Sequence, residues 1–454
     1  MYWQDKKVTV LGLSRSGLAS ARELAQLGCQ LSLSDLRTTE ELLPLVADLP
    51  QDRIRVEGGG HSSACLDADL IVLSPGVSID LPIIQAALAD GVPVIGEIEL
   101  AYQLRHDKPY VAITGTNGKT TTTTLVGEIL AASGLKAPIG GNIGTPLVGL
   151  IHEDADVYVA EVSSFQLETI NTFRPKVAAL LNFTDDHLDR HGSREVYWAM
   201  KKRVFENQEA DDWAILNADD ATVASLIGTL RARTLPFSAT KDLQEGIVVA
   251  DGWIVRRIAG GAQRVVPLNE IQLRGQHNLE NVLAAVGVAG ALDLPVERVR
   301  QAIAEFRGVE HRIEPVETLD GVHYVNDSKG TNYASTVKAI EAFNEPLVLI
   351  AGGRDKGGAI GGLVEAIANR AKHVVLVGEA APYFERVLRG AGYEALTMAQ
   401  DLPSAVAAAR AVAEPGDVVL FSPACTSFDM FKNYEERGRV YKSIVRELVG
   451  NRVG

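Results

Sequence analysis

Residues 111–125 place a lysine and a threonine directly after two glycines, in the order VAITGTNGKTTTTTL. The apolar run predicts a strand and the threonine-rich run a helix. The loop between them then lies at a helix N-terminus, where backbone N–H groups and the helix dipole favour an anion. Gly115 and Gly118 let the backbone close around a phosphate. Lys119 can reach terminal phosphates, and the Thr120 hydroxyl can bind Mg²⁺.

The spacing of this loop departs from the standard phosphate-binding motif. Two residues separate the first glycine from the Gly-Lys pair, where the standard motif has four. A plain strand-to-helix turn is therefore the alternative to nucleotide phosphate binding.

An acid and an imidazole follow two other expected strands. Glu161 ends VYVAE, and His187 follows VAALLNF in the segment TDDHLDRHG. Because parallel strands present their carboxyl ends at one sheet edge, we expect both side chains to reach the glycine loop and bind a metal there. Asp185, Asp186 and Asp189 are rival ligands that the sequence does not rank. A capping carboxylate and an exposed loop imidazole are the simpler alternatives.

The elements that position these residues form three successive blocks of alternating strand and helix patterns, which predicts an α/β fold. We expect a Rossmann-like domain at residues 1–97. A central domain of the P-loop mononucleotide-binding type is expected at 98–307. A second Rossmann-like domain is expected at 308–454.

Short apolar runs define the strands of the outer blocks, and a different pattern marks the central one. The first block contains VTVL, CQLSLSD, ADLIVLSPG and VPVIGEIE, and the third contains VHYVND, PLVLIAGG, HVVLVGE and DVVLFSPA. The central segment GIVVADGWIVRRIAGGAQRVVPL has turn signals at Asp251-Gly252 and Gly260-Gly261. It therefore predicts a small antiparallel patch.

Composition narrows the class of partner. The 454 residues carry a formal net charge of −14, which argues against nucleic acid or an anionic membrane as a partner. The three cysteines lack metal-ligand spacing, so neither a disulfide framework nor a zinc site is expected. The opening MYWQDKKVTVLGL lacks a secretory apolar stretch, and no run approaches the roughly 18 apolar residues that span a bilayer. The expected compartment is the cytoplasm.

The segment GLSRSG, residues 12–17, invites a second nucleotide interpretation. It follows a strand, and Asp35 ends the next one, as in a dinucleotide fingerprint. However, Ser14 stands where that fingerprint needs a glycine for close approach to a pyrophosphate. A nucleotide-dependent oxidoreductase that uses this block is thus a weaker alternative.

Further motifs occur along the whole chain in the order GTNGKTT, GGNIGTP, EVSSFQLE, DDHLDRHG, GQHNLEN, HRIE, NDSKGTN and SPACTSFDMFKNYEERG. Together they resemble the Mur ligase superfamily of ATP-dependent amide-forming enzymes. GTNGKTT and GQHN-type segments are shared across that superfamily, including folylpolyglutamate synthetase. NDSKGTN and SPACTSFDMFKN are characteristic of its D-glutamate-adding members. Gly330 stands where alanine is commoner, and the DNPR motif of the diaminopimelate- or lysine-adding members is absent.

The resemblance implies a ligase that joins D-glutamate to UDP-N-acetylmuramoyl-L-alanine in peptidoglycan precursor synthesis. ATP would convert the L-alanine carboxylate to an acyl phosphate, and the D-glutamate amine would displace phosphate through a tetrahedral intermediate. Two Mg²⁺ ions and a carbamylated lysine, Lys201, are also implied, because a carbamate binds Mg²⁺ whereas an ammonium repels it. Lys202 is the adjacent alternative, and the spacing from Tyr197 favours Lys201. The resemblance further implies that residues 1–97 are the UDP-substrate-binding domain, 98–307 the central ATPase domain and 308–454 the amino-acid-binding domain. A monomer is expected.

The resemblance also assigns roles by position. The catalytic residues would be Lys119, Glu161, His187 and Lys201. The metal ligands would be Thr120, Glu161, His187 and Lys201. ATP would contact Gly115, Thr116, Asn117, Gly118, Lys119, Thr120, Thr121, Asn278, Asn281, Arg312, Asp327 and Lys329. The UDP-substrate would contact Ser16, Asp35, Arg37, Ser74, Gly76 and Asn142. D-Glutamate would contact Thr331, Lys356, Ser427 and Phe428.

Two other classes of function stay open at this point. A sister ligase would use the same chemistry with another amino acid or a folate substrate. A non-catalytic nucleotide-binding protein would keep the glycine loop alone, and the presence of Lys119, Glu161, His187 and Lys201 together speaks against it.

Overall fold

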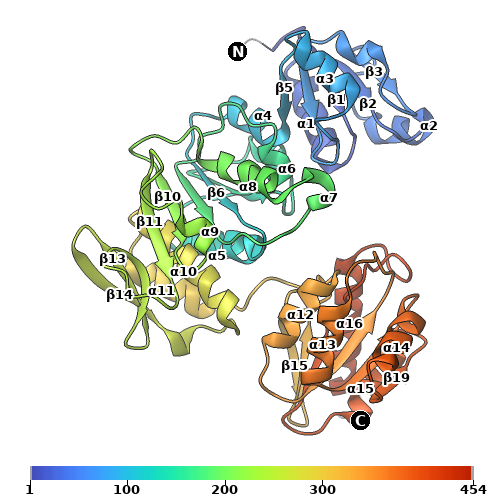
Figure 1. The fold of residues 1–454 in the computed structure, drawn as a ribbon. Helices are drawn as coiled ribbons and strands as arrows, with labels where there is room; N and C mark the ends of the chain where they lie inside the picture. The colour runs from blue at the N-terminus through green and yellow to red at the C-terminus, as the bar shows by residue number, and fades with distance from the viewer. Residues whose placement is uncertain (1–2, 451–454) are drawn as a thin grey trace. The chain divides into compact units, whose positions relative to one another are not determined.

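The computed structural model of the chain contains three separate sheets in two compact units (Figure 1). It describes residues 3–450, apart from the side chains of 188, 189, 449 and 450. One unit holds the chain up to residue 271 together with 280–305, and the other holds 272–279 with the chain from 306 onward. The first two sheets belong to the first unit, and the third sheet belongs to the second.

The first sheet is entirely parallel, with the order β3-β2-β1-β4-β5. The order reverses beside β1, so the loops after β1 and β4 flank the crevice where α/β sheets bind ligands. Its strands are β1 Lys7–Leu11, β2 Gln30–Ser34, β3 Ile54–Glu57, β4 Leu70–Leu73 and β5 Val94–Gly96. Its α-helices are α1 Arg15–Gln26, α2 Thr39–Leu42 and α3 Pro82–Ala89, with 3₁₀ turns at Leu43–Val46 and Ser63–Leu66.

The middle sheet has the order β14-β13-β12-β11-β10-β9-β6-β8-β7. Its parallel part reads as continuous apolar runs because both faces are covered, and all five residues of β6 are buried. These strands are β6 Tyr110–Thr114, β7 Ile139–Gly141, β8 Tyr158–Glu161, β9 Val177–Leu180, β10 Trp213–Asn217 and β11 Arg233–Ser238. The helices are α4 Glu97–Leu104, α5 Lys119–Ala132, α6 Ser164–Leu167, α7 Leu188–His191, α8 Arg194–Lys202, α9 Ala221–Ala224, α10 Gln276–Ala291 and α11 Val296–Glu305.

The predicted antiparallel patch is present as β12 Gly246–Ala250, β13 Trp253–Ile258 and β14 Gly261–Pro267. Asp251 and Gly252 form the first turn, both with positive φ (49° and 75°). The second turn lies one residue earlier than the sequence suggested. Ala259 and Gly260 form it with φ of 52° and 75°, and Gly261 already pairs with Ile258.

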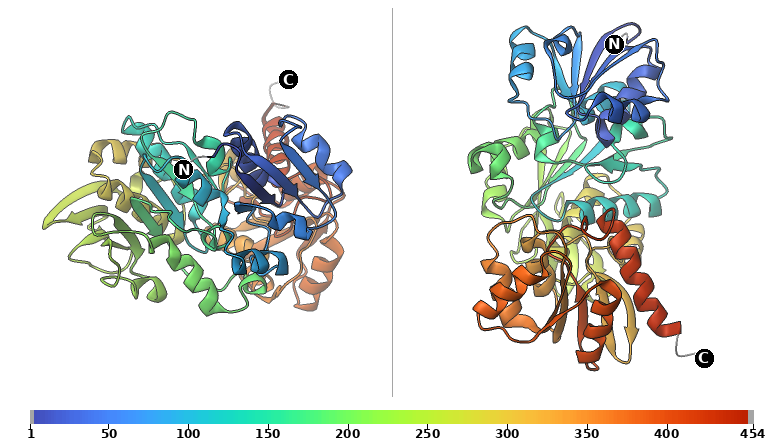
Figure 2. Two further views of the ribbon diagram at one scale, coloured as in Figure 1. Left: turned by 90° about the horizontal axis from the view of Figure 1, so that it is seen from above. Right: turned by 90° about the vertical axis from the view of Figure 1, so that its right-hand side faces the viewer.

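The third sheet has the order β15-β16-β20-β17-β18-β19 and is parallel except for β15. Alternate residues of β17 enter different cores: Leu349 packs with residues of α12–α14, and Ile350 with residues of α15 and α16. The strands are β15 Glu314–Leu319, β16 Val322–Asn326, β17 Leu347–Gly352, β18 Ala371–Val377, β19 Leu396–Met398 and β20 Val418–Phe421. The helices are α12 Tyr333–Glu341, α13 Gly361–Arg370, α14 Ala381–Gly390, α15 Leu402–Val412 and α16 Tyr434–Gly450, of which α16 runs along β15 and β16 (Figure 2).

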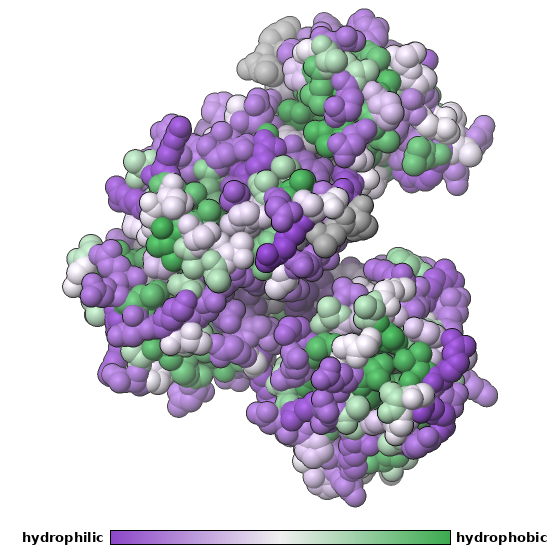
Figure 3. Space-filling view, viewed as in Figure 1, coloured by the Kyte–Doolittle hydropathy of each residue, from purple (hydrophilic) through white to green (hydrophobic). Residues whose placement is uncertain are grey.

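The visible surface of each part is largely hydrophilic (Figure 3), in keeping with the excess of acidic residues. Among the residues that the structure describes, no helix has both the length and the apolar character needed to cross a membrane.

Candidate active site

The glycine loop after β6 has the geometry of an anion cradle. Gly115 and Gly118 take φ of 151° and 82°, and α5 begins at Lys119. A Cβ atom on Gly118 would lie 2.1 Å from the Oδ1 atom of Asn281, and the positive φ at this position also favours glycine. Asn281 therefore borders the cradle.

Two lysines converge on one carbonyl of this loop. The Nζ atoms of Lys119 and Lys201 donate to the Gly115 oxygen at 2.9 and 2.7 Å. Lys201 is buried, with 1% of its surface exposed, and burial followed by the charge of Lys119 lowers its pKa well below the ordinary value. Lys202 is only partly buried and lies over the Trp198 ring. Of the two adjacent lysines, Lys201 is therefore buried at the loop and Lys202 is partly exposed.

Glu161 presents a carboxylate oxygen that lacks a protein partner. It ends β8, in register with Ile113 of β6 and so beside the cradle. Its Oε1 atom accepts a hydrogen bond from Asn142 at 2.8 Å, while Oε2 is buried and has no hydrogen-bond partner among the described residues. A buried oxygen of this kind is costly unless a cation or donor meets it, so the site fits a bound metal ion.

His187 packs among aromatic rings close to the cradle. Its φ is 51°, and its ring contacts those of Phe165 and Tyr197, with centroids 4.9 and 6.3 Å away. The hydroxyl of Tyr197 lies 3.3 Å from that of Thr116 in the cradle. His187 therefore connects to the loop through Tyr197.

The rival carboxylates differ in their partners. Asp185 pairs with Arg194 at 2.7 Å, and Asp186 accepts from the backbone N–H of His187 at 2.9 Å. The side chain of Asp189 lies outside the described residues. In the part of the chain that is described, no three His, Cys, Asp or Glu side chains converge on one point.

Asn182 supports the cradle and is absent from the sequence prediction. Its side chain accepts from the N–H of Asn117 at 2.8 Å and donates to the Asn117 oxygen at 3.1 Å. Its own carbonyl accepts from Thr116 at 3.1 Å. Asn182 follows β9, the neighbour of β6, so its position after a parallel strand is the signal that could have identified it.

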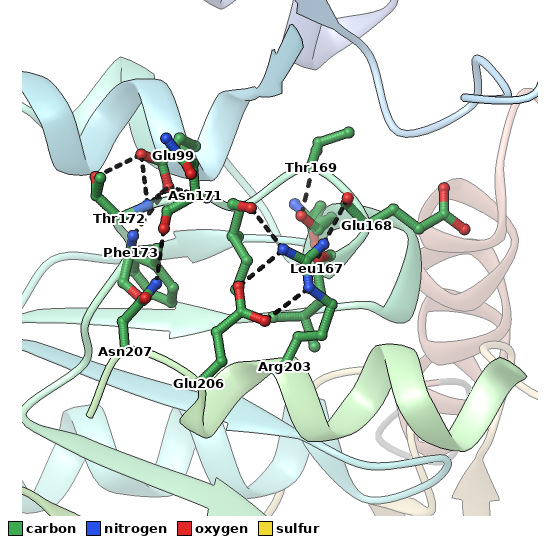
Figure 4. Close-up of polar contacts among 12 residues, drawn as sticks. Glu99, Leu167, Glu168, Thr169, Asn171, Thr172, Phe173, Arg203, Glu206 and Asn207 are labelled. Atoms are coloured by element: carbon green, nitrogen blue, oxygen red, sulfur yellow. Dashed lines mark hydrogen bonds and ion pairs between the residues drawn. The ribbon is translucent and has the colours of Figure 1, made fainter. Parts of the chain in front are cut away.

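The segment of residues 167–173 is held by a cation on one side and an anion on the other (Figure 4). Arg203 donates to the carbonyls of Leu167, Glu168 and Ile170 at 2.6–2.8 Å. The buried carboxylate of Glu99 accepts from the N–H groups of residues 171–173 at 2.8–3.0 Å. Because Arg203 lies two residues after Lys201, this brace also fixes the end of α8.

Most residues predicted for the UDP-substrate follow the carboxyl ends of β1, β2 and β4, whereas Asn142 follows β7 of the middle sheet. Asp35 accepts from the N–H of Leu13 at 2.6 Å, and the hydrogen bond from Arg37 holds the pKa of Asp35 well below its usual range. Ser74 donates to the Gly12 carbonyl at 2.7 Å. Ser14 is the N-cap of α1 and is exposed, which leaves the dinucleotide alternative without its close-approach glycine.

Arg312 lies in a strained segment of the second unit. His311 and Ile313 on either side of it have φ of 66° and 45°, and such values are outliers for a β-branched residue. The Nε atom of Arg312 is buried without a hydrogen-bond partner among the described residues. Burial raises the pKa of nearby Asp327 to about 6, while the hydrogen bond from Ser422 opposes that rise. Strain and an unmet donor are features of ligand sites.

Gly330, in the same segment as Asp327, is required by close packing. A Cβ atom at this position would lie 2.5 Å from the Oδ2 atom of Asp327 and 2.7 Å from the Ser422 hydroxyl. In this loop conformation the alanine that is commoner in the motif would not fit.

The residues predicted for D-glutamate follow three adjacent strands of the third sheet. Thr331 comes after β16, Lys356 after β17 and Ser427 after β20, so parallel pairing brings the three loops to one edge. Ser427 is buried, and Phe428 is 61% exposed. Arg437, which the sequence prediction missed, lies beneath these loops and donates to the carbonyls of Ser328 and Cys425 at 2.8 and 3.1 Å.

The structure therefore groups the predicted residues by unit. The cradle, Glu161, Asn142, His187, Lys201 and Asn281 lie in the first unit with the UDP-substrate residues. Asn278, whose side chain donates to the Arg274 carbonyl at 2.7 Å, lies in the second unit. That unit also contains Arg312, Asp327, Lys329, Thr331, Lys356, Ser427 and Phe428.

Three α/β sheets, of which the second in chain order carries a glycine loop with a lysine, define a class of nucleotide-dependent enzymes. Family models match all three parts of the chain. The Mur ligase MurD-like N-terminal domain matches residues 6–96, the Mur ligase middle domain 113–289, and the Mur ligase glutamate ligase domain 311–425.

Curated relatives agree over nearly the whole length. The UDP-N-acetylmuramoylalanine–D-glutamate ligase of Pelotomaculum thermopropionicum is 46% identical over 446 residues, or 98% of each chain. The enzyme of the same name from Koribacter versatilis is 45% identical over 448 residues, again 98% of each chain. The chain belongs to the Mur ligase family, among relatives named as its D-glutamate ligases.

Solved structures share the fold at low identity. The MurF ligase of Thermotoga maritima, solved in complex with ADP, gives a TM-score of 0.61 at 17% identity and covers 98% of this chain and 96% of that one. The UDP-N-acetylmuramate–alanine ligase of the same organism gives 0.57 at 20% identity over 97% and 99%. These likenesses support the three-domain α/β architecture.

Proposed function

We propose that this protein is an ATP-dependent ligase that joins D-glutamate to UDP-N-acetylmuramoyl-L-alanine, a cytoplasmic step of peptidoglycan precursor synthesis. The observation that carries the proposal is the cradle itself. Lys119 and Lys201 converge on Gly115 at the sheet edge where Glu161 holds an unpartnered oxygen. The relatives' names supply the substrates, and the cradle supports the use of ATP.

The first half of the reaction activates a carboxylate that is a poor acylating agent. The L-alanine carboxylate attacks the γ-phosphorus of ATP, ADP leaves, and an acyl phosphate forms. Lys119 and the N–H groups at the start of α5 stabilise the negative charge that spreads over the transferred phosphoryl oxygens. Asn182 and Gly118 preserve the shape of the loop that aims these donors.

The second half forms the amide. The D-glutamate amine attacks the acyl carbon, phosphate leaves from the tetrahedral intermediate, and the nitrogen loses a proton. Lys356 supplies the positive charge that a dicarboxylate requires, and Ser427 a buried hydroxyl. Their loops follow adjacent strands, and that arrangement supports a shared amino-acid site.

Glu161, Thr120, His187 and a modified Lys201 would hold the Mg²⁺ ions, which neutralise phosphate charge when bound. Carbamylation of Lys201 requires the neutral amine, which adds to carbon dioxide and loses a proton. Burial of Lys201 beside Lys119 favours that neutral form. The carbamate would place an anion at the Gly115 loop where the neutral amine stands, and two ions are proposed on that basis.

The testing experiment is a substrate screen scored by product mass. The protein is incubated with UDP-N-acetylmuramoyl-L-alanine, ATP, Mg²⁺ and one amino acid at a time. The expected product appears with D-glutamate and not with L-glutamate, L-alanine or lysine. A product with another amino acid would instead identify a sister ligase. Light scattering on the same preparation tests the expected monomer.

A further inference from the structure

The Phe165 ring, on α6, is a platform shared by three side chains of the segment that contains His187. The His187 ring meets it edge-on at 4.9 Å, the His191 ring stacks on it at 5.2 Å, and the Arg190 guanidinium lies over it at 4.8 Å from the centroid. A shift of Arg190 would therefore disturb the surface against which His187 packs.

Glu168, in the segment of residues 167–173, anchors the segment that contains His187, Arg190 and His191. Its carboxylate accepts from Arg190 at 3.2 Å and lies 3.4 Å from the Nδ1 atom of His191. Its side chain is 9% exposed, so the pair with Arg190 is largely desolvated. Since Arg203 and Glu99 hold the backbone on each side of Glu168, this anchor is rigid.

Arg190 also reaches the first sheet. Its guanidinium donates to the carbonyls of Gly76 at 3.4 Å and Val77 at 3.0 Å, in the turn that follows β4. On its other side this turn is bound to the β1 loop, through the hydrogen bond from Ser74 to Gly12. One side chain thus spans the turn proposed for the UDP-substrate and the segment that contains a proposed metal ligand.

We infer that Arg190 is a positioning residue that sets the turn at residues 74–77 for the UDP-substrate and at the same time holds His187 at the phosphate cradle. This inference rests on the proposed function of the first sheet. Its physical basis is the planar guanidinium, which directs several N–H groups in fixed directions, so the two backbone carbonyls and the Glu168 carboxylate are met at once. A point-like ammonium cannot satisfy that set.

The test compares Arg190→Met with Arg194→Met. Both remove an arginine from the same stretch of chain, but Arg194 pairs with Asp185 and lies over Phe183 instead of contacting the turn. We expect Arg190→Met to raise the KM for UDP-N-acetylmuramoyl-L-alanine, and the Kd for UDP alone, by roughly tenfold, the usual scale for lost charge-assisted hydrogen bonds. The KM for ATP should stay within about twofold, whereas kcat should fall because His187 loses its support. Arg194→Met should bind UDP as the unaltered protein does.

Two further variants keep the inference testable if Arg190→Met does not fold, which thermal unfolding reports. Arg190→Lys keeps the charge, and Glu168→Gln keeps Arg190 while weakening its anchor. Each should raise the Kd for UDP by less than Arg190→Met does, and each should leave the KM for ATP nearly unchanged. Calorimetry with UDP distinguishes failure of the proposed function of the first sheet from failure of the inference about Arg190. If the unaltered protein does not bind UDP, the proposed function of the first sheet fails. If it binds UDP and the Arg190 variants bind equally well, the inference alone is overturned.

Discussion

The first compact unit contains two strand–loop–helix units that share a backbone plan and differ in the side chains around their loops. In one, β6 runs through Gly115 and Gly118 into α5; in the other, β1 runs through Gly12 into α1. Both rely on close packing at a glycine, since a Cβ atom on Gly118 would strike Asn281 and one on Gly17 would lie 1.8 Å from the Gly12 oxygen.

The difference between the loops lies in charge. Around Gly115 the Nζ atoms of two lysines donate to a loop carbonyl, and Lys119 gives the β6 loop its cation. Around Leu13 the Asp35 carboxylate accepts the loop N–H, and Arg37 donates to the loop carbonyl at 2.9 Å. The β1 loop therefore has an acid beside it where the β6 loop has lysines. The comparison teaches that neighbouring side chains, more than the glycine pattern, decide which ligand such a loop suits.

The largest effect should come from removing the cation of the β6 loop. Lys119→Ala takes away the ammonium that faces the transferred phosphoryl group, so we expect ADP formation to fall by about 10²–10³-fold or more, the scale seen when one stabilising donor is lost. A coupled assay of ADP release measures it. Near-normal ADP production by this variant would refute the cradle assignment.

Lys201→Ala tests the second lysine of the same loop. Loss of the proposed carbamate should lower kcat by about 10²-fold, because an anion proposed to bind metal would be missing, and added short carboxylates should restore part of the activity. Lys202→Ala is the matched control, and we expect it to retain activity because Lys202 lies over Trp198 at the surface. The carbamate assignment is lost if carboxylates fail to rescue and both variants are equally inactive.

The acid of the β1 loop offers a smaller and more selective test. Asp35→Ala removes the acceptor for Leu13 and the partner of Arg37. We expect the KM for the UDP-substrate to rise by roughly tenfold and the KM for ATP to stay within about twofold, because the loss is confined to one loop. Steady-state kinetics with each substrate varied in turn measures both constants. An equal rise in both would show that the two loops are not independent.

The smallest effect concerns Glu97, where the chain passes from β5 of the first sheet into α4. This carboxyl is fully buried, and burial raises its pKa from 4.5 to about 7. Between these values the folded protein keeps a proton that the unfolded chain has lost, so the stability contribution present below pH 4.5 is lost as pH rises toward 7.

Glu97→Gln removes this titration. The free energy of unfolding of the unaltered protein, taken relative to the variant, should fall between pH 4.5 and 7 by at most about 1.4 kcal/mol per pH unit. Urea unfolding of the two proteins at several pH values measures the difference. A difference that does not vary with pH in this window would contradict a raised pKa.

Most strands were predicted from apolar runs or turn signals, whereas β3, β7, β10, β11, β15 and β19 were not. β1, β6 and β17 are buried on both faces, so each appears in the sequence as an apolar run that predicts a strand. β3 and β15 lie at the edges of their sheets, where IRVE and EPVETL are partly exposed and mix charged with apolar residues. Edge strands have one pairing partner and little burial, so no apolar signal marks them.

By itself the sequence determined the three-block α/β alternation and the glycine loop with Lys119. It also determined the adjacency of Glu161 to that loop, because parallel strands place their carboxyl ends at one edge. Only the tertiary structure distinguished buried Lys201 from partly buried Lys202 and revealed Asn182, Arg203 and Arg190. These roles depend on burial and on contacts between segments far apart in the chain. Such contacts arise when the sheets assemble, and no local pattern of residue types encodes them.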